Sequence, residues 1–195
     1  MGLHRAWPDA EIVGVDISPQ KNYPFTFFLG DALEYPLEGF DFVWASPPCQ
    51  QFSTAGLSHR MNGRKYQNLI EATRQKLIDS GIPWVMENVT NAPIRRDVVL
   101  CGSHFGLKVV RHRAFEFWEP RTILMPPCNH ASDVVTVCGH GTPSWVMKQR
   151  IERGFHANPT ITEKREAMGI GWTNREELSQ AIPPAYSEFI ASQLR

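Results

Sequence analysis

The chain has 195 residues, a formal net charge of zero at pH 7 and an apolar content of 42%. This length suits one domain with a sizeable core, and the apolar content argues against disorder. The balanced charge excludes a polycation, and no apolar run reaches the roughly 18 residues of a membrane span, so we expect no membrane partner. No export leader is evident. The four cysteines are therefore expected to be reduced thiols in a cytoplasmic protein: Cys49, Cys101, Cys128 and Cys138.

The first half of the chain alternates short apolar runs with loops. Four runs rich in β-branched or aromatic residues are expected to be strands: residues 11–17, 25–31, 40–45 and 83–89. Between the last two, apolar residues at helical spacing predict a helix that ends at Gly81. Buried strands separated by helices indicate an α/β fold with a doubly wound, mostly parallel sheet. Ligands of such sheets bind at the carboxyl ends of the strands, where Asp16, Asp31, Cys49 and Glu87 fall.

The second half of the chain is less regular. Two strands are predicted at residues 114–118 ("AFEFW") and 133–139 ("DVVTVCG"), with a proline-rich loop between them. Thr160–Glu163 and Thr173–Glu176 have the spacing of capping boxes, which predicts that short helices begin there. A last helix is predicted over residues 183–195, with two prolines at its start and an apolar face made by Tyr186, Phe189, Ile190 and Leu194.

The third predicted strand runs into "ASPPCQQFS" (residues 45–53), which places Cys49 directly after two prolines. The prolines fix the backbone at this corner, so the cysteine sulfur is held at the end of a strand. An ionised cysteine is the best nucleophile among the side chains, and this position suits covalent catalysis. The alternative is a buried structural cysteine after a proline turn.

Glu87 lies near the end of the fourth predicted strand. A carboxylate there is costly unless it is partnered or used, and burial would raise its pKa so that it can give a proton to a ring nitrogen. The alternatives are a helix cap or an ion pair with a nearby arginine. Arg111 and Arg113 precede an apolar run, and further basic residues gather at 59–66 and 148–165. These are either phosphate contacts or ordinary surface charge.

Three blocks, in this order, resemble the DNA cytosine-5 methyltransferase family: "SPPCQ" (46–50), "ENV" (87–89) and "RHRAFEF" (111–117). "GVDI" and "LGDAL" are similar to the family's blocks that bind S-adenosylmethionine, and "QAIPPAYSEFIASQL" is similar to its final block. The resemblance covers most of residues 10–118 and 165–195. It implies a Rossmann-like methyltransferase region at 1–118, a small target-recognition region at 119–160, and C-terminal helices at 161–195 that return to the catalytic region.

The activity that this resemblance implies is the transfer of a methyl group from S-adenosylmethionine to C5 of cytosine in double-stranded DNA, by a monomer. Cys49 would add to C6 of a cytosine flipped out of the duplex, because its C6 face is stacked inside the helix. Glu87 would hydrogen-bond or protonate N3. Arg113, and with it Arg111, would hold the base and support the catalytic loop.

The same resemblance implies a cofactor pocket. Asp16 would bind the ribose hydroxyls of S-adenosylmethionine, and Asp31 its adenine amino group. The further positions implied for this pocket are Ile17, Ala32, Ser46 and Pro47. Two positions depart from the family pattern: Val109 stands where a glutamine is usual, and Gln180 where an asparagine is usual.

The family's opening strand and glycine-rich turn, which cradle the methionine part of the cofactor, have no counterpart in "MGLHRAWPDAEIVGVDI". Residues 1–7 are similar to the helix that follows that turn. A doubly wound sheet without this central strand leaves the backbone groups of two strands without partners. We therefore expect the native reading frame to begin upstream of Met1, and a chain that starts there to bind the cofactor poorly.

A metal site is a weaker expectation. Cys128, His130, Cys138 and His140 form a CxH…CxH arrangement whose two thiolates and two imidazoles suit tetrahedral zinc. The spacing matches none of the common zinc ribbons. The favoured interpretation is therefore a loop and a strand that hold no metal.

Three alternative functions are considered. A thymidylate-synthase-like enzyme also attacks a pyrimidine with a cysteine, but the Glu-Asn-Val block argues against it. Amino-methyltransferases have an aromatic residue where this chain has Cys49, which excludes them. The strongest rival is a truncated or degenerate methyltransferase that binds DNA without methylating it.

Overall fold

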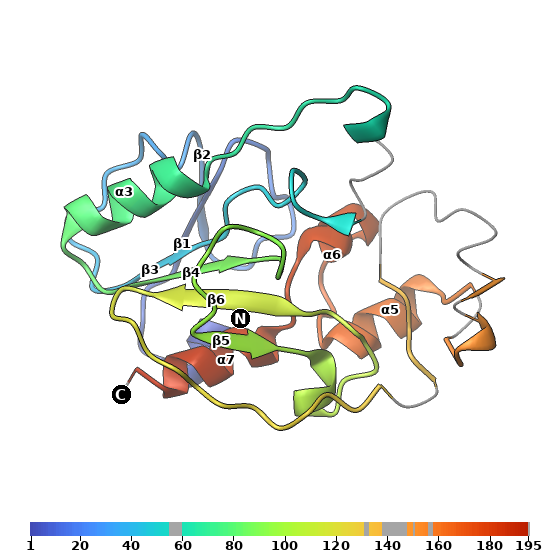
Figure 1. Cartoon of the computed structure of the whole chain (residues 1–195). Helices are drawn as coiled ribbons and strands as arrows, with labels where there is room; N and C mark the ends of the chain where they lie inside the picture. The colour runs from blue at the N-terminus through green and yellow to red at the C-terminus, as the bar shows by residue number, and fades with distance from the viewer. Residues whose placement is uncertain (55–59, 131–132, 138–147, 150, 156–157, 195) are drawn as a thin grey trace. The chain divides into compact units, whose positions relative to one another are not determined.

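The computed structural model describes residues 1–54, 60–130, 133–137, 148–149, 151–155 and 158–194 (Figure 1). The chain divides into two compact units, which are described separately here. Unit 1 consists of Met1–Gly30, Cys101–Arg111 and Pro127–Arg195, and unit 2 of Asp31–Leu100 and His112–Pro126. The predicted functional division at residues 118 and 160 stays a prediction.

Unit 2 is built on a four-stranded mixed sheet with the strand order β3–β4–β6–β5. Its strands are β3 (Val43–Ala45), β4 (Trp84–Asn88), β5 (Val98–Leu100) and β6 (Arg113–Phe117). β3 and β4 are parallel, whereas β6 is antiparallel to both β4 and β5. The predicted strands at 40–45, 83–89 and 114–118 are confirmed. β5 was missed, because an apolar run of three residues is too short to show a period.

Helix α3 (Ile70–Ser80) packs against this sheet (Figure 1). Ile70 and Leu77 of the helix form one apolar cluster with Trp84 and Met86 of β4. Burial of side chains of this size contributes roughly 1.5–3 kcal/mol each to folding. The helix ends at Gly81, whose φ of 67° lies in the left-handed region that glycine adopts without steric cost. The predicted helix and its end are confirmed.

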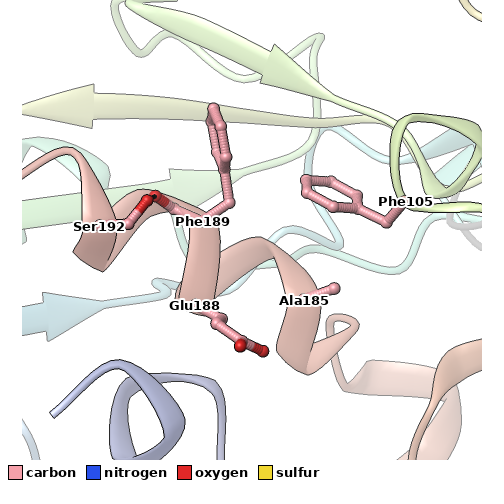
Figure 2. A pocket seen from close by; sticks show the side chains of 5 residues that line it. All are labelled: Phe105, Ala185, Glu188, Phe189 and Ser192. Atoms are coloured by element: carbon pink, nitrogen blue, oxygen red, sulfur yellow. Dashed lines mark hydrogen bonds between the residues drawn. The ribbon is translucent and has the colours of Figure 1, made fainter.

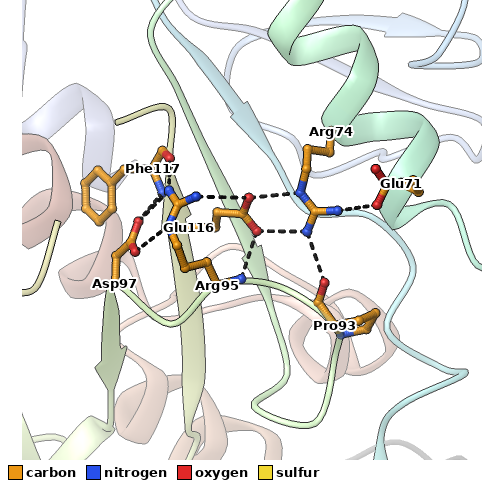
Figure 3. Close-up of polar contacts among 7 residues, drawn as sticks. All are labelled: Glu71, Arg74, Pro93, Arg95, Asp97, Glu116 and Phe117. Atoms are coloured by element: carbon orange, nitrogen blue, oxygen red, sulfur yellow. Dashed lines mark hydrogen bonds and ion pairs between the residues drawn. The ribbon is translucent and has the colours of Figure 1, made fainter. Parts of the chain in front are cut away.

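A buried carboxylate links α3 to β6 (Figure 3). Glu116 of β6 is 2% exposed, and both of its oxygens accept hydrogen bonds of 2.9 Å from the guanidinium of Arg74 on α3. The backbone N–H of Arg95 also donates to Glu116 at 2.9 Å, and its side chain pairs with Asp97. The buried charge is therefore fully partnered, which is the condition under which a charge is tolerated in a core.

Unit 1 contains a two-stranded parallel sheet of β1 (Val13–Asp16) and β2 (Thr26–Leu29), which confirms the first two predicted strands. Its helices are α1 (Gly2–Ala6), the 3-10 helix η2 (Gly102–Phe105), α5 (Ile161–Met168), α6 (Arg175–Gln180) and α7 (Pro184–Ser192). The contact between α1 and α7 requires a glycine, because a Cβ at Gly2 would lie 2.0 Å from the carbonyl oxygen of Pro184.

Three details of the second half test the sequence patterns. Thr160 caps α5 and shares a capping box with Glu163, as predicted. Helix α6 begins one residue later than predicted, because the Asn174 side chain accepts from two backbone N–H groups and so replaces Thr173 as the cap. The strand predicted at 133–139 is wrong for its described part, where the pairing is one isolated bridge between Val134 and Phe155. Residues 138 and 139 lie outside the described residues.

The fold is mixed α/β, as expected, with small sheets. The described strands form two sheets instead of one, and β6 runs antiparallel to its neighbours. The described residues therefore do not confirm a single doubly wound, mostly parallel sheet. None of the described helices is long and apolar enough to span a membrane.

Candidate active site

The Pro-Pro-Cys corner follows β3 in unit 2, and the chain turns sharply directly after it. Cys49 is partly buried, and its carbonyl oxygen accepts from the backbone N–H groups of Phe52 and Ser53, each at 2.9 Å. Arg60 closes this turn, since its guanidinium donates to the carbonyl oxygens of Gln50 at 2.5 Å and Ser53 at 2.9 Å. The nucleophile candidate therefore lies on a restrained turn.

Asn88, the last residue of β4, fixes the corner to the sheet. Its side-chain N–H donates to the carbonyl oxygen of Pro47 at 2.8 Å, and its Oδ1 accepts from the backbone N–H of Val89 at 2.9 Å. Asn88 is 1% exposed, so both bonds are shielded from water. The parallel register sets Ala45 beside Met86, which brings the corner and the end of β4 to the same edge of the sheet.

At that edge Glu87 forms an ion pair with Arg113. The Nε of Arg113 lies 2.8 Å from Oε1 of Glu87, and the two side chains are only 13% and 8% exposed. The antiparallel register explains the pair: Ala114 lies opposite Asn88, so the first residue of β6 meets the end of β4. The ion pair with a nearby arginine, which the sequence suggested as an alternative role for Glu87, is therefore present. It also orients the carboxylate, so a structural and a catalytic role are compatible.

The sheet thus brings together three of the predicted catalytic residues at the carboxyl end of β3 and β4: Cys49, Glu87 and Arg113. A sulfur on a rigid turn can attack a carbon, and an oriented acid at the same sheet edge can stabilise the charge that the attack creates. The proton transfer from Glu87 that its burial led us to expect stays a prediction.

In a comparison with known proteins, residues 15–95 match the family model for C-5 cytosine-specific DNA methylase. The matched range includes Cys49 and Glu87 and ends before Arg111 and Arg113. No curated protein matches the chain.

Arg111, predicted to hold the base of the methylase substrate, belongs to unit 1 and is buried there. Its guanidinium donates to the backbone carbonyl oxygens of Val137 at 3.3 Å and Ser179 at 2.6 Å. Its own carbonyl oxygen accepts from the hydroxyl of Tyr186 at 2.7 Å. These contacts give Arg111 a structural role in unit 1, and its contact with a base stays a prediction.

The predicted cofactor residues of the methylase lie on turns at strand ends. Asp16, the last residue of β1, accepts from the backbone N–H of Ser18 at 2.7 Å and from the side chain of Gln20 at 3.3 Å. Ile17 beside it is 74% exposed. A hydrogen-bond acceptor next to an exposed apolar side chain fits a nucleoside, which has ribose hydroxyls and an apolar ring face.

The other predicted cofactor residues lie in unit 2. Asp31 accepts from the backbone N–H of Leu33 at 2.8 Å, and both Asp31 and Ala32 are exposed. Ser46 is exposed and its hydroxyl accepts from the indole N–H of Trp44 at 3.1 Å, whereas Pro47 is buried. Their contact with a cofactor stays a prediction.

Two residues of the site were missed by sequence reasoning. Asn88 stood beside Glu87 in the pattern, but its bond to Pro47 depends on a strand pairing that the sequence does not display. Arg60 was grouped with basic residues interpreted as either phosphate contacts or ordinary surface charge, yet its guanidinium binds backbone carbonyl groups after Cys49. The signal available for Asn88 was a polar side chain near a predicted strand end, whereas no sequence pattern distinguished Arg60 from the other basic residues around it.

An open groove lies in unit 1, lined by Phe105, Ala185, Glu188, Phe189 and Ser192 (Figure 2). Phe105 and Phe189 meet edge to face, with ring centroids 5.8 Å apart. The groove is formed by η2 and α7 and contains none of the predicted methylase residues, so it is not the candidate site.

Proposed function

We propose that this protein transfers a methyl group from S-adenosylmethionine to C5 of cytosine in DNA through a covalent bond between Cys49 and C6. The observation that carries the proposal is the arrangement at one sheet edge: Asn88 holds the Cys49 corner at Pro47, and Arg113 holds Glu87 one residue away on β4. The match of residues 15–95 to the DNA methylase family supports it.

The chemistry explains why this arrangement suits cytosine. C5 is a weak nucleophile, because it is part of an aromatic ring. When the Cys49 thiolate forms a bond to C6, the electrons of the C5–C6 double bond move onto C5 and toward N3. Glu87 stabilises the charge at N3 by a hydrogen bond or by giving a proton, and Arg113 keeps its carboxyl group in place. The electron-rich C5 then accepts a methyl group.

The reaction ends by reversal of the addition. After C5 has accepted the methyl group, it carries that group and its original hydrogen. Loss of this hydrogen as a proton restores the double bond to C6, and the bond between C6 and the sulfur of Cys49 breaks. The net change is one methyl group gained and one proton released, so no oxidant or reductant is needed.

S-adenosylmethionine, when bound, supplies an electrophilic methyl group. We propose that Asp16 and Ile17 hold its nucleoside, together with Asp31 and Ala32, and that Ser46 and Pro47 border the methyl donor. This assignment goes with a doubly wound, Rossmann-like fold of the methyltransferase type. The target cytosine must leave the duplex, since Cys49 cannot reach a stacked C6, and Arg111 is proposed to help hold the flipped base.

The test is the formation of 5-methylcytosine in DNA incubated with the protein and isotopically labelled S-adenosylmethionine, measured by mass spectrometry of the nucleosides. We expect label in 5-methylcytosine, and a loss of about a thousandfold or more in the rate for Cys49→Ser. The control is that Cys49→Ser keeps the melting temperature and the DNA affinity of the wild type. Wild-type protein that binds DNA and cofactor but yields no labelled 5-methylcytosine would contradict the proposal.

A further inference from the structure

Three side chains with metal-binding atoms meet in unit 1, and none of them is a predicted methylase residue. Cys101 follows β5 and caps η2, whereas Cys128 and His130 lie on the segment that begins at Pro127. The two sulfurs and an imidazole nitrogen lie within 4.8 Å of one another, and the Sγ of Cys101 is 3.4 Å from Nε2 of His130. Residues 101 and 128–130 are far apart in sequence, so this meeting is a product of the fold.

The spacing of these atoms suits one particular class of metal. In a tetrahedral zinc site, zinc–sulfur and zinc–nitrogen bonds of about 2.3 Å and 2.0 Å place sulfur and nitrogen about 3.5 Å apart. The distance between Cys101 and His130 is close to this value. Two thiolates and an imidazole are soft ligands that favour zinc, whereas magnesium and calcium require oxygen ligands.

His104 adds an outer layer of hydrogen bonds. Its Nδ1 accepts from the backbone N–H of Cys101 at 3.2 Å, so its proton is assigned to Nε2, which lies 3.5 Å from the Sγ of Cys128. The backbone N–H of His104 points at the sulfur of Cys101. Both sulfurs therefore have an N–H donor, which is the second layer that orients metal-bound thiolates.

We propose that Cys101, Cys128 and His130 bind a zinc ion that fastens the segment after Pro127 to η2 within unit 1. The fourth position of the tetrahedron is left for a further ligand. This site differs from the CxH…CxH arrangement considered from the sequence, since Cys138 and His140 lie outside the described residues and Cys101 enters in their place. It also replaces the expectation that the protein holds no metal.

The first test is the zinc content of the purified full chain, measured by inductively coupled plasma mass spectrometry after desalting. We expect about one zinc per chain in the wild type and a loss of most of it in Cys128→Ser and His130→Ala. Both of these side chains are exposed, so their replacement leaves the core intact. Cys49→Ser is the matched control and is expected to keep its zinc.

A second measurement identifies the ligands. Cobalt(II) placed in the site is expected to give the visible absorption of tetrahedral cobalt and a thiolate charge-transfer band, which weakens in Cys128→Ser. Zinc removal is expected to lower the melting temperature of the wild type and to leave that of Cys128→Ser unchanged. None of these readouts depends on methylation, so the zinc proposal can fail while the proposed function stands.

Three results would overturn this proposal. In the first, wild-type protein holds no zinc and takes up none when an equimolar amount is added. In the second, Cys128→Ser and His130→Ala keep a full complement of zinc. In the third, a Cys101→Ser protein that melts cooperatively keeps its zinc, which would favour the arrangement with Cys138 and His140.

Discussion

At the scale of single residues, the ion pair of Glu87 and Arg113 bears on both the stability of the sheet edge and the proposed reaction. Both side chains are mostly buried, and the 2.8 Å contact between them supplies the partner that a buried carboxylate needs. Loss of one partner leaves the other as an uncompensated charge, which costs more than the pair itself contributes. The pair is therefore sensitive to mutation for a structural reason as well as a catalytic one.

We predict that Arg113→Ala lowers the free energy of unfolding by about 3–5 kcal/mol, because Glu87 stays buried without its cation. Urea unfolding measures this change. Arg96→Ala is the matched control: Arg96 is exposed, and its loss is expected to change stability by less than about 0.5 kcal/mol. Equal effects of the two substitutions would show that the ion pair does not stabilise the sheet edge.

The candidate site shows how far single residues can be inferred from sequence. Cys49 and Glu87 were each unusual at their positions, and the resemblance of the blocks around them to the DNA cytosine-5 methyltransferase family led to their predicted roles. Their supports, Asn88 and Arg60, were not, because their bonds reach backbone carbonyl groups that only the folded chain brings near. Arg111 has the same residue type as Arg113, and the difference between them lies in what each one contacts.

At the scale of elements, α3 and β6 are joined by the network around Glu116. Arg74 reaches Glu116 from the helix, and Arg95 reaches it from the segment before β5. Three parts of unit 2 thus share one buried carboxylate. Two guanidinium groups pair with it, so its neutralisation disturbs both.

We predict that Glu116→Gln lowers the free energy of unfolding by about 3 kcal/mol, since Arg74 and Arg95 lose their shared anion. Glu71→Gln is the control on the same helix. Glu71 pairs with Arg74 at 2.5 Å, but its side chain is 79% exposed, and a surface pair contributes only about 0–1 kcal/mol. Denaturation midpoints of the two variants test this difference, and a larger loss in Glu71→Gln would contradict it.

The elements that sequence patterns predicted share one property, which is that their signals are local. The apolar period and Gly81 define α3, and the capping box at Thr160 defines the start of α5. What the sequence did not show depends on contacts distant in sequence: the grouping of the described strands into two sheets and the antiparallel direction of β6. The shift of the α6 cap from Thr173 to Asn174 reflects two equally good caps side by side.

At the scale of the whole molecule, each compact unit has a polar centre of its own. Unit 2 contains Cys49, Glu87 and Arg113, and unit 1 contains Cys101, Cys128 and His130. The sequence alone led to the first centre, because its residues fall in ordered blocks near strand ends. For the second centre, the sequence spacing suggested Cys138 and His140 as partners of Cys128 and His130, since spacing could not show that residue 101 lies beside residues 128 and 130.

The central claim is that the sulfur of Cys49 adds to C6 of cytosine while Glu87 stabilises the ring. This addition makes C5 basic, so C5 exchanges its hydrogen with water even when no methyl donor is bound. The most direct measurement is therefore the release of tritium from DNA labelled at cytosine C5, without S-adenosylmethionine. The account predicts release by the wild type and none above background by Cys49→Ser. Equal release by both proteins, or none by a folded wild type that binds the DNA, would contradict it.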